Sequence, residues 1–164
     1  MYLEFSTDFH DTDLALERLV LLLAPQGMAS FLQLEIGPYL RERAKQRFRD
    51  EGDDVTGDWA PLQEATINIR ESQNIPGEHP INRRHGGLEN WVVDGGWNAY
   101  PAGFGGALRY PAHEPSGKTR EKAITAQSGS VSPASVPRPV LGVNEKDLIF
   151  VTTALAFSIH EAFQ

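Results

Sequence analysis

The sequence predicts an α+β fold, in which helices pack on a small antiparallel β-sheet and a long polar loop precedes a C-terminal helix. Three observations lead to this prediction. Apolar residues recur at helical spacing from Leu32 to Phe48 and again from Leu148 to Phe163. Short runs with strand-like alternation lie between them, in a segment rich in Gly and Pro. A length of 164 residues suits one domain over residues 1–164.

The N-terminal region is expected to form a short strand and then a helix. Apolar and polar residues alternate loosely over residues 2–5, which favours the strand. The Asp11–Asp13 segment offers N-caps for the helix, and Pro25 and Gly27 are expected to end it.

A longer helix is predicted to follow, with Ser30 as its cap and Gly52 after its end. One face carries an apolar stripe at i, i+4 spacing, made of Leu32, Ile36, Leu40, Ala44 and Phe48. Pro38 either kinks this helix or marks its true start, because a proline is tolerated only in the first turn.

The middle of the chain shows little periodicity and is predicted to form short strands joined by loops. The strand candidates are Thr66–Arg70, Asn90–Val93 and Ala107–Tyr110. A polar stretch at about 115–135 is predicted to be a flexible loop, longer than the usual connection within a compact domain.

An extended strap leads into the last helix. Pro137 and Pro139 exclude helix around Arg138, and Asn144 is a suitable N-cap for a helix over residues 145–163. That helix is apolar on more than one face, which predicts a place in the core or against a neighbouring subunit.

Composition narrows the classes of function. The net charge of −7 argues against a protein that mainly wraps nucleic acid. The absence of cysteine excludes disulfides, thiolate metal sites and cysteine nucleophiles. The N-terminus has no basic segment followed by an apolar one, so we expect a cytoplasmic protein without a secretion signal.

The sequence shows no catalytic constellation, and we expect neither enzymatic activity nor a cofactor. Asp8, His10, Asp11 and Asp13 could mark a small metal-dependent hydrolase, but their spacing matches no calcium loop and lacks a second histidine for zinc. A turn that caps the first helix explains the same residues more simply.

The predicted long helix also carries a row of cations, which are Arg41, Arg43, Lys45, Arg47 and Arg49. The simpler interpretation is a solvated face, since Glu42 and Asp50 dilute the charge. The alternative is a basic rim that faces an acidic ring or DNA in a channel.

The order of short motifs along residues 36–163 resembles one family. The motifs are Trp59-Ala60-Pro61-Leu62 with Thr66 and Arg70, Pro80-Ile81, Gly86-Gly87-Leu88 before Trp91, Tyr110-Pro111-Ala112-His113, and the strap Val136-Pro137-Arg138-Pro139-Val140-Leu141-Gly142. In this order they resemble the phage virion morphogenesis proteins, the tail-completion family of tailed bacteriophages. The chain departs from the family pattern at Pro111 and at Val140, where the family commonly has an aromatic residue.

This resemblance implies a structural virion protein of the tail or neck, assembled in the host cytoplasm. Such a protein would act as a ring subunit, most plausibly in a hexamer, that terminates the tail and joins it to the head. Its partners would be identical subunits, the tail tube protein, neck or connector proteins, and DNA in the channel. Arg138, Pro139, Trp91, Trp97, Lys118 and Arg120 are the predicted contact residues.

Three alternatives stay open at this point. The first is a head-closure or adaptor protein on the portal side, which belongs to the same class. The second is the small metal-dependent hydrolase described above. The third is a monomeric binding module that merely shares the strap.

Overall fold

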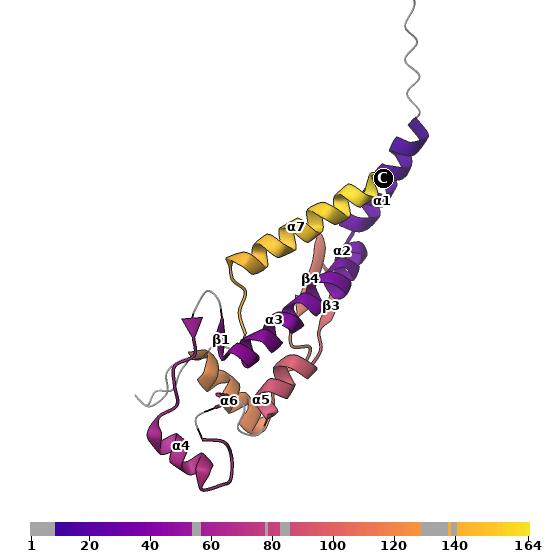
Figure 1. The fold of residues 1–164 in the computed structure, drawn as a ribbon. Coiled ribbons are helices and arrows are strands. Elements are labelled where there is room, and N and C mark those ends of the chain that lie inside the picture. Colours follow the sequence, from indigo (N-terminus) through magenta and orange to yellow (C-terminus); the bar gives the residue numbers. More distant parts are fainter. Residues whose placement is uncertain (1–8, 54–56, 78, 83–85, 129–137, 139–140) are drawn as a thin grey trace, which may run out of the picture. The chain divides into compact units, whose positions relative to one another are not determined.

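The computed structural model describes residues 9–53, 57–77, 79–82, 86–128, 138 and 141–164, with side chains from residue 13 onward. The fold is α+β, as predicted: helices dominate, and the described strands form two separate two-stranded sheets (Figure 1). The chain divides into two compact units. Unit 1 combines Met1–Ile36, Ala99–Leu108 and Glu145–Gln164, and unit 2 combines Gly37–Asn98 and Arg109–Asn144.

Unit 1 is built from helices and one β-hairpin. Its elements are α1 (Phe9–Leu23), α2 (Pro25–Phe31), the π-helical turn η1 (Leu32–Ile36), strands β3 (Asn98–Ala102) and β4 (Gly105–Arg109), and α7 (Glu145–Ala162). Helix α1 contacts both α2 and α7. The last helix thus begins directly after Asn144, as the strap and cap pattern predicts.

The bend between α1 and α2 has a local cause. Ala24 is extended and Pro25 opens α2 at a position where its missing N–H removes no helical hydrogen bond. Gly27 lies inside α2 rather than after α1, and a Cβ there would stand 2.0 Å from the carbonyl oxygen of Leu21. The predicted end of the first helix before Pro25 is therefore confirmed, and Gly27 permits the close approach of the two helices.

The hairpin packs on the helices of its own unit. The Ala99 backbone N–H in β3 donates to the side-chain oxygen of Gln33 in η1 at 3.1 Å. A Cβ at Gly106 in β4 would stand 2.8 Å from the backbone of Ala29 in α2. The strand predicted at Ala107–Tyr110 therefore exists as β4, although it ends at Arg109.

Unit 2 holds the main apolar core. Its elements are α3 (Gly37–Asp50), β1 (Gly52–Asp53), β2 (Gly57–Asp58), α4 (Glu64–Glu71), α5 (Gly87–Glu89), the π-helical turn η2 (Asn90–Asp94) and α6 (Gly117–Ser128). Phe48 and Trp59 meet edge to face, with ring centroids 5.5 Å apart. Around them are buried Ala44, Ile81, Leu88, Val92, Val93 and Ala126.

The long-helix prediction is confirmed in its pattern and divided in its geometry. The inner stripe is buried or half-buried, but it runs through η1 into α3. Pro38 lies in the first turn of α3, which agrees with a true start there rather than a kink within one helix. Ser30 is no cap, since its hydroxyl donates to the Gln26 carbonyl one turn back inside α2.

Two predicted strands are helical instead. Thr66–Arg70 lies in α4, and Asn90–Val93 forms η2. The helix places Thr66 and Arg70 on the same side one turn apart, and the buried Arg70 guanidinium donates to the carbonyls of Gly77 and Pro80. Tertiary contacts of this kind override the modest strand preference of β-branched residues.

The predicted loop at about 115–135 is helical over Gly117–Ser128, so the prediction is wrong there. This segment is rich in Lys, Glu, Arg and Ala, which are good helix formers, and Ala123 and Ala126 pack on the core of unit 2. The rest of the predicted loop lies outside the described residues, as does the strand predicted at 2–5.

Candidate assembly surface

Helix α1 is apolar around most of its circumference. Ala15 is buried, and Leu19 and Leu22, which follow on the same side, are half-buried. On its other sides Leu16, Val20 and Leu21 are exposed to 47%, 67% and 68%. A helix that is apolar all round is normally buried, so this exposure indicates that α1 lacks a covering element.

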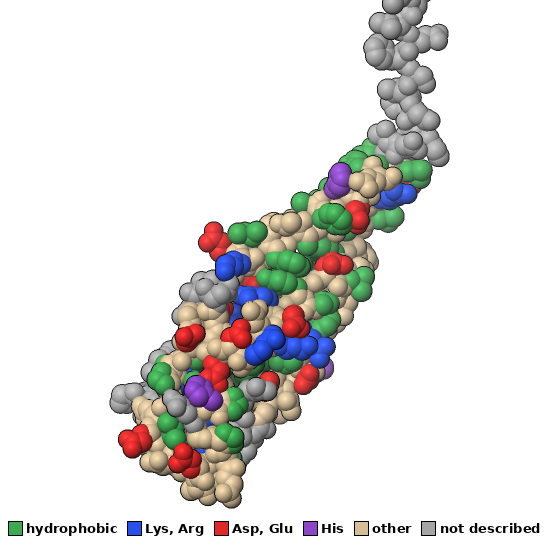
Figure 2. Space-filling model, in the orientation of Figure 1, with side chains coloured by type: hydrophobic (Ala, Val, Ile, Leu, Met, Phe, Trp, Pro, Cys, Tyr) green, Lys and Arg blue, Asp and Glu red, His purple; other side chains and the backbone are tan. Residues whose placement is uncertain are grey.

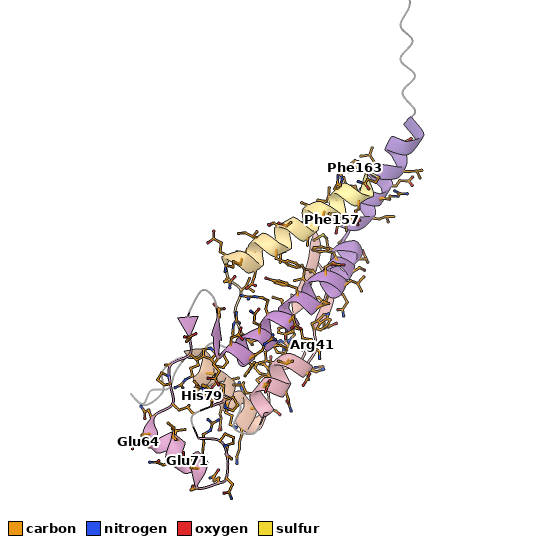
Figure 3. The ribbon with its side chains drawn as sticks, in the orientation of Figure 1. Arg41, Glu64, Glu71, His79, Phe157 and Phe163 are labelled. Atoms are coloured by element: carbon orange, nitrogen blue, oxygen red, sulfur yellow. The ribbon has the colours of Figure 1, made fainter. Side chains whose placement is uncertain are left out.

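Helix α7 repeats the pattern at the other end of the chain. Leu148 and Ile149 are exposed near its start, and Phe157 and Phe163 are exposed to 59% and 52% near the C-terminus (Figure 3). Asp147, by contrast, is buried in the first turn. The prediction that the last helix is apolar on more than one face is confirmed.

The tip of the β3–β4 hairpin adds one aromatic side chain. Phe104 is fully exposed, and it follows Gly103, whose positive φ of 55° turns the chain. No part of the apolar ring is covered by the described residues around it. An aromatic ring at such a tip is typical of an anchor that enters a pocket on a partner.

We use the term assembly surface for the exposed apolar side chains of unit 1. They are Leu14, Leu16, Val20, Leu21, Leu23, Leu34, Phe104, Leu148, Ile149, Phe150, Phe157 and Phe163. Figure 2 shows hydrophobic side chains gathered over the part of the molecule where α1 and α7 lie. Together they expose at least several hundred Å² of apolar area, the scale at which a monomer's surface marks an interaction site.

The cations of α3 are largely matched within unit 2. Arg41, labelled in Figure 3, donates to the Val93 carbonyl and pairs with Asp94 at 3.2 Å. Arg47 forms a buried ion pair with Asp53 at 2.5 Å. Lys45 and Arg49 lie near Glu42. These pairs favour the interpretation of this row as a structural and solvated face.

The two tryptophans predicted as contacts pack within unit 2. The Trp91 indole N–H donates to the His113 carbonyl at 2.8 Å, and its ring lies against the core. The Trp97 ring lies so close to Gly37 that a Cβ there would stand 2.1 Å from the indole nitrogen. Both side chains are half-buried, and the structure gives each of them a packing role.

Arg138 was expected to point outward, and the structure places it inward. Its Nε and Nη2 donate to the carbonyls of Ala60 and Pro61 at 2.6 and 2.7 Å, and its backbone N–H donates to Ala126 at 2.7 Å. Burial lowers the pKa of this guanidinium. The strap is therefore tied into unit 2 at Arg138, because this side chain satisfies two carbonyls that bend toward it.

The other predicted contacts have different positions. Lys118 and Arg120 are exposed on the first turn of α6, and Pro139 lies outside the described residues. Asp8 does as well, while the backbone at His10, Asp11 and Asp13 is already helical in α1. These acidic residues are consequently not a capping turn before the helix. Among the side chains that the structure describes, no cluster of three His, Cys, Asp or Glu residues could hold a metal ion.

Comparisons with models of protein families, with curated proteins and with solved structures found no match to this chain. Within the described residues no single helix is both long and apolar enough to cross a membrane; the bent pair Asp13–Leu23 and Pro25–Asp50 passes by length and composition alone. The assignment of function accordingly depends on the assembly surface and on the sequence motifs.

Proposed function

We propose that this chain is a non-enzymatic ring subunit of a tailed-phage virion, one that completes or terminates the tail and joins it to the head. The observation that carries the proposal is the exposed apolar side chains of α1 and α7. A subunit that remains alone would leave them in water at a cost of roughly 25 cal/mol per Å². A neighbouring copy removes that cost.

The order of motifs supports the virion part of the proposal, since their sequence along residues 36–163 resembles the tail-completion proteins. Unit 2 supplies a self-contained core and unit 1 supplies the adhesive surface, which suits a subunit that folds before it assembles. Head-to-tail contacts between such subunits close into a ring when the rotation between neighbours divides a full turn. A hexamer is the ring that we expect.

Native mass spectrometry over a range of concentrations tests the proposal. The expected result is a closed oligomer, with six copies as the main species and no ladder of higher masses. Purified tail tubes should then shift this species into a tube-bound fraction, whereas a head-side adaptor would bind purified portal instead. A monomer at every concentration that also binds neither structure would contradict the proposal.

A further inference from the structure

A groove of about 390 Å³ lies within unit 2, between α4, α6 and Arg138. This volume is in the range of pockets that bind small ligands or short peptide segments. Leu62, Leu88 and Ala126 contribute its apolar lining, and Leu88 and Ala126 belong to the buried core. The apolar side of the groove is therefore as rigid as the core beneath it.

The groove also holds a buried donor. The side-chain nitrogen of Asn82 is inaccessible to solvent and has no hydrogen-bond partner among the described residues. The backbone next to it is fixed, because the Ile81 N–H donates to Glu51 at 2.7 Å and Arg70 donates to the Pro80 carbonyl at 2.7 Å. A buried amide of this kind is normally satisfied, so Asn82 indicates a missing acceptor.

Arg138 supplies a second donor to the same groove. Its Nε and Nη2 are engaged by backbone carbonyls, which neutralise none of its charge. No carboxylate among the described residues pairs with this guanidinium. A half-buried cation without a counter-charge attracts an anion more strongly than an exposed one, because solvent screens it less.

The charge of the lining has the opposite sign to the charge of the chain. Arg70, Arg138 and Lys122 contribute three cations against the single carboxylate of Glu121, whereas the whole chain carries −7. Thr66 and Thr125 add hydroxyl groups. The groove thus combines an apolar floor with donors and positive charge, which suits a carboxylate flanked by apolar side chains.

We propose that this groove binds a carboxylate carried by an extended peptide segment of a partner protein. The Asn82 amide and the Arg138 guanidinium donate to the carboxylate, Lys122 attracts it, and the neighbouring apolar side chains of the peptide rest on Leu62 and Leu88. The proposal does not depend on the assembly surface, because a monomer would bind the same peptide.

The test uses the full ¹⁵N-labelled chain and three N-acetylated tripeptides, followed by NMR. The first is Leu-Glu-Leu with an amidated C-terminus, the second replaces Glu by Gln, and the third is Leu-Gln-Leu with a free C-terminal carboxylate. The first should shift the Asn82 side-chain amide and the Arg138 Nε–H, and should bind at least about tenfold more tightly than the second. Binding of the third instead would assign the site to a chain terminus.

Two pairs of variants make the test specific. Asn82→Asp should abolish binding of the acidic peptide by repulsion, and Asn82→Gly should weaken it; Asn82 has a positive φ of 60°, which Gly and Asp both accept. Lys122→Gln should weaken binding several-fold, while Lys118→Gln, on the same helix but outside the groove lining, should leave it unchanged. Equal binding of the Glu and Gln peptides, no shift at Asn82, or equal losses in the two lysine variants would overturn the proposal.

Discussion

Units 1 and 2 differ in what they do with their apolar residues. Unit 2 buries Phe48, Trp59 and Val92 in one cluster. In unit 1 the buried apolar residues among those described include three alanines, Ala15, Ala29 and Ala162, together with Phe31 and Ile36. Many of its Leu, Val and Phe side chains remain exposed on α1 and α7. The difference indicates that unit 2 is stabilised from within, whereas unit 1 gains burial by association.

The strongest way to test this comparison is to truncate one phenylalanine in each unit. Phe48→Ala should lower the free energy of unfolding by about 3–5 kcal/mol, because Phe48 is 1% exposed and contacts Trp59. Phe157→Ala is the matched control, and at concentrations where the protein is dissociated it should cost less than about 1 kcal/mol. Urea denaturation measures both. Equal losses would contradict the division between the units.

A second prediction concerns association alone. The double variant Val20→Ser and Leu21→Ser should weaken assembly by about 2–4 kcal/mol, since both side chains are mostly exposed and their burial against a neighbour would be lost. Sedimentation velocity measures the shift toward monomer, roughly 30-fold or more in dissociation constant. A wild-type distribution of species in the variant would exclude α1 from the interface.

A third prediction compares tight and open packing at two glycines. Gly37→Ala should cost about 1–3 kcal/mol, because its Cβ would meet the Trp97 indole and force the ring to move. Gly105→Ala, at the hairpin in unit 1, is the control, since nothing lies within 4 Å of the added atom. Thermal unfolding should show a lower Tm for the first variant only. A lower Tm in both, or in neither, would show that the two sites do not differ in packing as described.

The smallest predicted effect is the pH dependence of Tyr110. Its hydroxyl donates to the Val92 carbonyl at 2.7 Å, and burial raises the pKa of the phenol to about 12. The neutral form is thus favoured in the folded state, so this contribution to stability is complete below pH 10 and is lost between pH 10 and about 12. Tyr110→Phe should cost about 1 kcal/mol at pH 8 and reduce the alkaline loss of stability. An unchanged alkaline loss in the variant would assign it to other groups.

The elements with strong helical periodicity could be predicted from the sequence. The Leu32–Phe48 stripe and the C-terminal helix belong to this class, because their apolar spacing reflects their own packing. The predicted strands at Thr66–Arg70 and Asn90–Val93 could not be corrected from local pattern. Their helical state depends on contacts distant in sequence, such as Arg70 with the Gly77 and Pro80 carbonyls.

The candidate site was only partly visible in the sequence. The apolar faces of α7 indicated a neighbouring subunit, and the run Leu19–Leu23 carried the same signal for α1, which an ordinary core helix also produces. Arg138 shows the opposite limit. Its flanking prolines fix an extended backbone, yet the direction of its side chain depends on the carbonyls of Ala60 and Pro61, nearly 80 residues away in the chain.

Hydroxyl-radical footprinting at low and high protein concentration tests the central claim most directly, because it reports the solvent exposure of individual side chains. The account predicts that oxidation of Leu21, Phe157 and Phe163 falls as the protein associates, while Trp91 and Trp97 in unit 2 react equally at both concentrations. Unchanged oxidation of the three unit 1 side chains under conditions where the protein is oligomeric would contradict it.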